Sequence, residues 1–337
     1  MKSLIIDYMR LMRMPGIIGL AITPIAGALS VSNTSLAALI PLFFIGAISK
    51  IYGFVMNDYF DVEVDKLSPD LSQRALVKGT ITKKHALTII VSCFFIGYIA
   101  IFVFFFKNEP FFYMGLLCII VADILGFIYN KYGKRLIGSD FLIALAESLF
   151  FLFGALMVLP NGSLGLLTWV LFIILFNEQL YMNVIVGGLK DADHDYQMDV
   201  KNIALASGVK VGPGNTLSVP LGFKIFGLSE RFISSFLVFV PFLFLGIKYE
   251  LWQTGLLLLI IVFLITESTF MLSRTRFNRK EIRRLIGAQL ITWHPLIPII
   301  LVSVVGFWYP FLLVILALFG YIFFSLLMGQ KLDAPAM

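Results

Sequence analysis

Two short acidic segments stand out in a chain in which only 14% of the residues are charged. The segments are NDYFDVEVD, residues 57–65, and KDADHDYQMD, residues 190–199. Each holds three oxygen-bearing side chains at a spacing of four residues: Asn57, Asp61 and Asp65 in the first, and Asp191, Asp195 and Asp199 in the second. On a helix this spacing places the members of a triplet along one face. The sequence therefore predicts two lines of oxygen ligands.

Closely spaced carboxylates repel one another and are costly unless a cation lies between them. Mg²⁺ suits this role, because it takes oxygen ligands and is usually held by one or two carboxylates together with substrate phosphates. Basic residues near both segments are suited to contact phosphate oxygens: Arg74, Lys78, Lys131, Lys134, Arg135 and Lys190. Zinc is disfavoured, since His194 has no cysteine or histidine companion at ligand spacing. We therefore expect a site for Mg²⁺ and a diphosphate, although charge runs can also mark solvated loop edges.

The elements that must position these residues are membrane-spanning helices. The chain has 337 residues, of which 59% are hydrophobic, and a mean hydropathy of +0.95. Helices satisfy every backbone hydrogen bond in lipid, and no alternating pattern indicates a barrel. We expect a bundle of nine or ten transmembrane helices, because Pro295 interrupts one run and Tyr309-Pro310 is either a turn or a kink. The expected spans are residues 14–31, 36–57, 86–106, 111–130, 140–159, 164–188, 231–248, 251–272, 286–306 and 309–328.

The charges of the connections predict the orientation in the membrane. Connections after the second, fourth, sixth and eighth expected spans are rich in lysine and arginine, whereas the opposite connections carry only Lys107 and Lys248. By the positive-inside rule, the N-terminus and both acidic segments face the cytoplasm. This topology accounts for the net charge of +6 without any nucleic-acid partner.

Several charged residues fall inside the expected spans, where they are costly and often functional. Lys50 precedes Asn57 by two helical turns and so shares the face of the first motif. Four acids are similarly placed: Asp123, Glu147, Glu178 and Glu267. Lys50 is the best candidate for a catalytic role among these residues. The alternative is a buried polar pair between Lys50 and one of the acids.

With these motifs in place, the sequence resembles the UbiA superfamily of intramembrane prenyltransferases. NDYFDVEVD followed by SPDLSQRALVKG, residues 68–79, is similar to the first aspartate-rich motif and arginine loop of that family. YNKYGKR, residues 129–135, resembles its Tyr-Asn-Lys segment, and GLKDADHDYQMD, residues 188–199, its second aspartate-rich motif. Order, spacing and topology match from about residue 10 to residue 275.

The resemblance implies one all-helical membrane domain over residues 1–337, with a central cavity that opens to lipid beneath a cytoplasmic cap. Residues 57–85 would form the first motif and its loop, and residues 190–230 the second motif and an extended loop. Such enzymes bind an isoprenyl diphosphate through Mg²⁺ and transfer the prenyl group to a lipophilic acceptor. The implied Mg²⁺ ligands are principally Asn57, Asp61, Asp191 and Asp195, supported by Asp58, Asp65 and Asp199. Arg74, Lys131, Lys134 and Lys190 would hold the diphosphate, and Tyr129 would border the leaving group or the cation.

Three features depart from the family pattern. Arg74 is followed by Ala75-Leu76, where the family commonly has Arg-Pro-Leu. Residues 211–230 lengthen the loop after the second motif, and their Gly and Pro content suggests turns and a short strand pair. This loop is either a lid over the site or a passive connector. A tenth span would exceed the nine helices associated with the family.

The chemistry agrees with this resemblance on physical grounds. Metal ions stabilise the diphosphate that leaves an allylic carbon, and an intramembrane cavity with aromatic faces protects the cation from water. The chain has 34 phenylalanines and 12 tyrosines to supply such faces. The acceptor stays open among a quinone precursor, a tetrapyrrole alcohol, a glycerol-phosphate lipid and a polyene. The competing function is a secondary transporter, but transporter sites lie near the bilayer midplane and both triplets lie at helix ends.

Overall fold

The computed structural model describes residues 2–66, 71–107 and 110–329, so residues 68–70 of the expected arginine loop lie outside the described residues. The class expected from the sequence, an all-α polytopic membrane protein, is confirmed. Within the described ranges, ten helical segments are long and apolar enough to cross a membrane: Leu4–Ser30, Leu36–Asp65, Lys83–Phe105, Phe111–Arg135, Ser139–Val158, Leu166–Lys190, Leu221–Leu243, Leu251–Leu272, Arg279–Val305 and Trp308–Leu327.

The first segment is divided into three short helices, α1 (Lys2–Leu11), α2 (Met14–Ala21) and α3 (Thr23–Ser30). Both α2 and α3 have a proline in their first turn, where its missing N–H leaves no intrahelical bond unmade. Arg13, between α1 and α2, has a φ of 51°, a left-handed conformation that is uncommon outside glycine. This break turns the chain and brings the Arg13 side chain to the first acidic motif.

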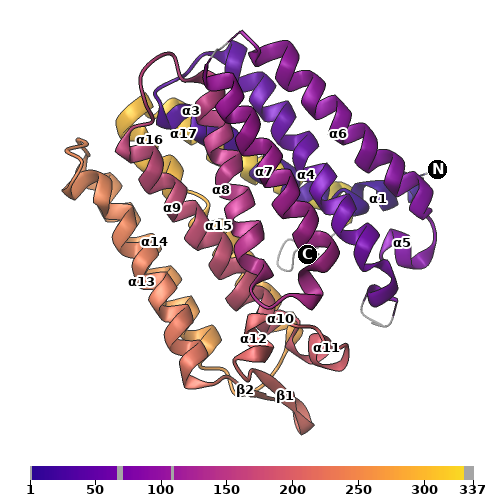
Figure 1. Cartoon of the computed structure of the whole chain (residues 1–337). Coiled ribbons are helices and arrows are strands. Elements are labelled where there is room, and N and C mark those ends of the chain that lie inside the picture. The colour runs from indigo at the N-terminus through magenta and orange to yellow at the C-terminus, as the bar shows by residue number, and fades with distance from the viewer. Residues whose placement is uncertain (1, 67–70, 108–109, 330–337) are drawn as a thin grey trace.

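The first motif is carried by α4 (Leu36–Asp65), a continuous helix of 30 residues. The chain then passes through α5 (Ala75–Lys78) to α6 (Lys83–Phe105), where the Thr82 side chain caps the helix by accepting a hydrogen bond from the backbone N–H of His85. Next come α7 (Phe111–Tyr132), the 3-10 turn η2 (Gly133–Arg135) and α8 (Ser139–Val158). As a result, the end of α4, α5 and the turn after α7 all lie at one end of the bundle (Figure 1).

Close approach of α3 and α8 builds the centre of the core. A Cβ atom at Gly154 would collide with the carbonyl oxygen of Pro24, and one at Gly27 with that of Phe151. Small residues allow backbones to pack this closely, which favours helix association in a membrane. The surrounding core consists of buried aliphatic and aromatic side chains such as Leu29 and Phe153.

The second motif follows a helix that changes form. The sixth span consists of α9 (Leu166–Tyr181), the π-helical segment η3 (Met182–Gly187) and α10 (Gly188–Lys190), and is followed by α11 (Ala192–Gln197) and α12 (Ile203–Ala206). The expectation that Asp191, Asp195 and Asp199 lie along one helix face is wrong. Asp191, at φ −105° and ψ 6°, separates α10 from α11, and Asp199 lies beyond α11 at φ 50°. Aspartate favours such helix ends and tolerates left-handed backbone.

The connection after α12 contains an antiparallel hairpin of β1 (Lys210–Gly212) and β2 (Thr216–Ser218), joined by the turn η4 (Pro213–Asn215). The strand pair suggested by the sequence is thus present. Backbone bonds tie the hairpin to the segment after the eighth span, since the Leu217 N–H donates to the Thr275 carbonyl at 2.8 Å. Every hairpin residue is described, and none lines the cavity presented below. This placement favours the connector over the lid.

The last five helices are α13 (Leu221–Leu243), α14 (Leu251–Leu272), α15 (Arg279–Trp293), α16 (Leu296–Val305) and α17 (Trp308–Leu327). Two predicted starts among these helices are wrong, and the first segment of the chain likewise begins at Leu4 and not at residue 14. The seventh span begins at Leu221 and not at residue 231, and the ninth begins at Arg279 and not at residue 286. The first turn of each helix contains charged residues, so a prediction based on hydropathy assigns that turn to a loop. Pro295 separates α15 from α16, as its position in the sequence suggested.

Four of the five intramembrane charges noted in the sequence have polar partners within the bundle. Glu178 on α9 accepts a hydrogen bond from Arg231 on α13 at 2.7 Å, and each residue is only 1% exposed. The Tyr98 hydroxyl donates to Asp123 at 2.7 Å. Lys50 on α4 forms an ion pair with Glu147 on α8. Such pairing is the usual way in which charge is tolerated at membrane depth.

Candidate active site

A cavity of about 630 Å³ begins between the helix ends that carry the two acidic motifs and extends into the bundle. Its polar lining includes Asn57, Asp61, Lys134, Lys190, Asp191 and Asp195. Apolar side chains from α2, α15 and α17 complete the wall: Leu20, Ile286, Leu290, Val314 and Leu318. The cavity therefore offers charged groups and a hydrocarbon surface to one ligand.

Two buried carboxylates of the first motif fix two arginines. Arg74, which precedes α5, places Nη1 3.3 Å from Asp58 Oδ1 and 2.5 Å from Asp65 Oδ2. Arg13 donates from Nη2 to Asp58 Oδ1 at 2.9 Å and to Asn57 Oδ1 at 3.2 Å. Burial opposes the charge of Arg74, but Asp58 and Asp65 outweigh burial and raise its pKa. Both arginines line the cavity, so they present fixed positive charge beside the motif.

Lys134 connects the first motif to the loop that follows the second. Its ammonium nitrogen lies 3.1 Å from Asp61 Oδ1 and 4.0 Å from Asp65 Oδ1. Its carbonyl oxygen accepts a hydrogen bond of 2.9 Å from the Lys201 backbone N–H. The turn η2 thus holds a cation between acids of the first motif and is itself held by the loop of the second.

The second motif contains carboxylates with different partners. Lys190 Nζ lies 3.3 Å from Asp191 Oδ2. The Asn202 side chain donates to Asp195 Oδ2 at 2.7 Å, and its own Oδ1 caps α12. Burial, together with the charge of Asp191, raises the pKa of Asp195 to about 7. Burial and the neighbouring Arg279 lower the pKa of His194. Asp195 therefore changes charge near neutral pH.

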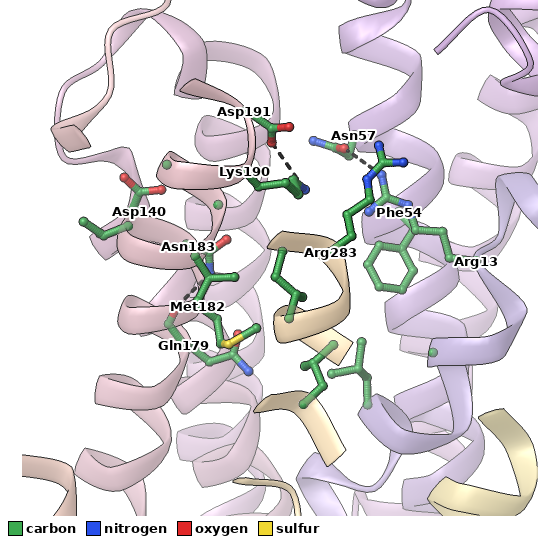
Figure 2. A pocket seen from close by; sticks show the side chains of 18 of the residues that line it. Arg13, Phe54, Asn57, Asp140, Gln179, Met182, Asn183, Lys190, Asp191 and Arg283 are labelled. Atoms are coloured by element: carbon green, nitrogen blue, oxygen red, sulfur yellow. Dashed lines mark hydrogen bonds and ion pairs between the residues drawn. The ribbon is translucent and has the colours of Figure 1, made fainter. Parts of the chain in front are cut away.

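A layer of amides and one tyrosine lies between the motifs. Asn57 donates to Asn130 Oδ1 at 3.2 Å, and the Tyr129 hydroxyl donates to Asn183 Oδ1 at 3.4 Å. Figure 2 shows Asn183, Met182 and Gln179 on one wall and Asn57, Phe54 and Arg13 on the other, with Arg283 between them on the α15 ribbon. These amides add neutral oxygen and nitrogen ligands to the charged groups.

Most of the residues selected from the sequence meet at this cavity. Those that line it are Asn57, Asp61, Asp65, Arg74, Tyr129, Lys134, Lys190, Asp191 and Asp195. Four others do not line it: Lys50, Asp58, Lys131 and Asp199. Asp58 is buried behind the motif, where it contacts both arginines, and Asp199 is exposed beyond α11. Lys131 is exposed and lies over the rings of Phe127 and Tyr132.

Lys50 has a different environment from the one expected for a catalytic residue. Its ammonium pairs with Glu147 and lies 5.0 Å from the centre of the Phe150 ring. Both partners stand on α8, on a side of α4 that the cavity does not reach. These contacts favour the alternative interpretation, in which Lys50 forms a buried polar pair with an acid.

The structure also adds site residues that the sequence did not single out. Arg13, Arg279 and Arg283 line the cavity, although their charges indicated only membrane orientation. Arg279 donates to Asp193 Oδ1 at 2.6 Å, which ties α15 to α11. A signal for the two α15 arginines was present, because Arg279 and Arg283 are four residues apart and continue the apolar stripe of Ile286 and Leu290.

The donor set fits a hard cation. Among the described residues, no three acidic, histidine or cysteine side chains already converge on one point. Asp61 and Asp191 are instead paired with Lys134 and Lys190. The cavity nevertheless offers carboxylate and amide oxygens from both motifs, which Mg²⁺ prefers, and no cysteine lines it.

The helical membrane bundle with acidic motifs at a shared cavity is the architecture of an intramembrane prenyltransferase. The model of the UbiA prenyltransferase family matches residues 18–280, and the chain belongs to this family. A relative, digeranylgeranylglyceryl phosphate synthase of Saccharolobus solfataricus, is 28% identical over 262 residues, which cover 72% of this chain and 86% of the relative.

Solved structures with the same fold are more distant in sequence. The apo structure of a UbiA homologue from Aeropyrum pernix K1 has a TM-score of 0.64 at 18% identity, and the match covers 82% of this chain and 94% of that one. A UbiA homologue from Archaeoglobus fulgidus bound to GPP and Mg²⁺ has a TM-score of 0.61 at 17% identity, over 88% of this chain and 99% of that one. Both support the fold assignment.

Proposed function

We propose that this protein transfers an isoprenyl group from a prenyl diphosphate to a lipophilic acceptor within the membrane, with Mg²⁺ as cofactor. The observation that carries the proposal is that two acidic motifs, distant in sequence, reach one cavity that also has an apolar wall. Membership of the UbiA prenyltransferase family supports it. The Archaeoglobus fulgidus homologue of the same fold, bound to GPP and Mg²⁺, agrees with the choice of donor and metal.

In this proposal Asn57, Asp61, Asp191 and Asp195 hold Mg²⁺, since all four line the cavity with oxygen atoms. When bound, Mg²⁺ supplies positive charge that stabilises the diphosphate as it departs. Asp58 and Asp65 act through the arginines that they fix. Arg74, Lys134 and Lys190 contact diphosphate oxygens, and the two lysines exchange their present carboxylate partners for phosphate. In the resting state, the lysines and the carboxylates neutralise each other, so neither charge is left without a partner.

The reaction breaks the bond between the allylic carbon of the donor and its diphosphate oxygen, and the bonding electrons go to diphosphate. A nucleophilic atom of the acceptor then forms a bond to the allylic cation, and its proton passes to the released diphosphate. Tyr129 borders the cation, because it lines the cavity between the motifs. The apolar wall excludes water, which would otherwise capture the cation.

Among the acceptors left open by the sequence, a lipid with a glycerol-phosphate head group fits best. A relative that matches most of this chain is named for the synthesis of digeranylgeranylglyceryl phosphate. The cavity of this protein offers an amphiphile both cationic and apolar surfaces. We also propose that both motifs face the cytoplasm, because the basic connections lie at the same end of the bundle as the motifs.

The proposal is tested with the purified protein in lipid vesicles. Geranylgeranyl diphosphate is supplied with an alkylglyceryl phosphate that bears one isoprenoid chain, with Mg²⁺ or with excess chelator. We expect diphosphate release and a prenylated lipid by mass spectrometry only with Mg²⁺. Uptake of either compound into the vesicles without bond cleavage would indicate a transporter and contradict the proposal.

A further inference from the structure

We propose that Arg283 is the residue that recognises the acceptor, by binding a phosphate group on its head. The inference rests on the proposed function and deepens it, because it assigns a second anion-binding position next to the diphosphate site. Arg283 lies beyond residues 18–280, which the family model matches. It stands on α15, and its side chain lines the cavity.

The first observation is that, among the described residues, Arg283 lacks the acidic partner that every other lysine and arginine of the cavity has. Within the described part of the chain, ion pairs join the other five to nearby aspartates: Arg13 and Arg74 to Asp58, Lys134 to Asp61, Lys190 to Asp191 and Arg279 to Asp193. No such pair is found for Arg283 among these residues, and its Nε is enclosed without a hydrogen-bond partner. A half-buried guanidinium without an anion is costly, so the site is completed by an anionic ligand.

The second observation is the depth of Arg283 in the cavity. Arg279, one helical turn earlier, is bound to Asp193 on α11 at the polar end. Beyond Arg283, the same face of α15 continues with Ile286, Gly287 and Leu290, all of which line the cavity. Arg283 therefore marks the boundary between the charged and the apolar lining. A head group at this boundary allows the attached chain to extend along α15 and α17.

The third observation concerns the space around the guanidinium. Figure 2 shows Arg283 extending from α15 toward Asn57 and Arg13. Arg13 uses one nitrogen, Nη2, for its contacts with Asn57 and Asp58, and its guanidinium lies 4.9 Å from the centre of the Phe54 ring. Arg13 is thus held in place on the opposite wall. Two guanidiniums from facing walls match the several oxygens of a phosphate better than the two of a carboxylate.

These contacts separate the acceptor phosphate from the diphosphate of the donor. The metal ligands Asn57, Asp61, Asp191 and Asp195, with Lys134 and Lys190, form the donor position. Arg283 comes from a different helix and, within the part of the chain that the structure describes, forms no ion pair with these side chains, so its charge is available for a second anion. An acceptor held there has its reactive oxygen close to the allylic carbon, which is the positioning that bimolecular transfer requires.

Direct binding tests the inference without any need for turnover. The full-length protein in detergent is incubated with a radiolabelled alkylglyceryl phosphate, in chelator and without donor, so that no metal can attract the phosphate. The same measurement uses the corresponding alkylglycerol, which lacks the phosphate. We expect the wild-type protein to bind the phosphate lipid more tightly, and Arg283→Gln to lose about 10- to 100-fold in that affinity. Arg283→Lys should fall between the two.

Arg284→Gln is the matched control, since Arg284 is exposed and does not line the cavity. It should bind like the wild-type protein. In turnover assays, Arg283→Gln should raise the KM for the phosphate lipid and leave the KM for the prenyl diphosphate unchanged. Melting temperatures of all variants confirm that they fold.

Three results would overturn the assignment of Arg283. Equal binding of the phosphate lipid and the alkylglycerol by the wild-type protein would show that no acceptor phosphate is recognised. A rise in the KM for the donor alone in Arg283→Gln would show that this residue contacts the diphosphate. Tighter binding of hydroxybenzoate than of the phosphate lipid would indicate that the acceptor carries a carboxylate. Absence of diphosphate release with every acceptor would instead contradict the proposed function, and the binding comparison would still decide the role of Arg283.

Discussion

The ammonium nitrogen of Lys134 lies 3.1 Å from Oδ1 of Asp61, so the turn after α7 neutralises the central carboxylate of the first motif. The backbone of Lys134 also accepts a hydrogen bond from Lys201, in the loop after the second motif. One residue therefore contacts both halves of the proposed metal and diphosphate site.

This position predicts opposite effects of Lys134→Gln on two ligands. Loss of the Lys134 ammonium leaves Asp61 without its ion-pair partner. Mg²⁺ binding in the absence of donor should therefore become stronger, because a competing positive charge is removed. The same loss should weaken prenyl diphosphate binding by about tenfold, as a charged hydrogen bond to phosphate disappears. Titration calorimetry with Mg²⁺ alone and with a non-reactive diphosphate analogue measures both effects. Weaker binding of both ligands would show that Lys134 only supports the local fold.

Arg74 is expected to depend on the shape of its guanidinium as well as on its charge. Arg74→Lys keeps one positive charge near Asp58 and Asp65, but a lysine that makes the two contacts of Nη1 has no second nitrogen left for the diphosphate. We predict an increase in donor KM of about tenfold, with little change in acceptor KM. Lys78→Gln is the control, because Lys78 is exposed in the same loop and does not line the cavity. An unchanged KM for the donor in Arg74→Lys would show that Arg74 does not bind the diphosphate.

Lys50 is expected to affect stability more than turnover. Lys50→Met leaves Glu147 without its partner inside the bundle, which should lower stability by about 3 kcal/mol. The double variant Lys50→Met with Glu147→Met should recover most of that loss, because neither charge is left alone. Melting temperatures in detergent, together with kcat for the folded protein, test this. A fall in kcat that persists in the double variant, at an unchanged melting temperature, would show that Lys50 takes part in catalysis.

The charge of Asp195 predicts how Mg²⁺ binding depends on pH. Burial and the charge of Asp191 raise the pKa of Asp195 to about 7, so the carboxyl is largely protonated below that pH and ionised above it. Mg²⁺ needs the ionised form, so its affinity should fall by up to about tenfold for each pH unit below 7 and level off above it. Asp195→Asn should bind Mg²⁺ more weakly and lose this dependence. An identical pH profile in the wild-type protein and in Asp195→Asn would assign the titration to another group.

Part of this site was predictable because it depends on local patterns. Asn57, Asp61 and Asp65 lie at the end of one long apolar run, and α4 continues as a regular helix through all three. The same reasoning failed for Asp191 and Asp199, because the helix breaks at Asp191 after a π-helical segment that spacing does not reveal. Helix starts were also missed where charged turns belong to the span, as at Arg279.

Other features depend on contacts between residues that are distant in sequence. The pairing of Lys50 with Glu147 joins α4 to α8, and spacing along α4 alone pointed Lys50 toward the motif. Arg13 contacts the first motif from the break in the first span, where its backbone is left-handed. In both cases the sequence shows that a charged side chain is present, and the packing of the helices determines which residue it contacts.

The central claim is that both acidic motifs act on one prenyl diphosphate, and prenyl transfer by Asp61→Ala and Asp191→Ala at limiting Mg²⁺ tests it most directly. Each substitution removes an oxygen ligand from the cavity, and should reduce transfer by about 10²- to 10³-fold, equivalent to about 3 to 4 kcal/mol of lost charge stabilisation. The product is measured by mass spectrometry of the prenylated lipid, with melting temperatures to show that both variants fold. The account predicts a comparable loss in the two variants. Near-normal transfer by either folded variant would contradict a site built from both motifs.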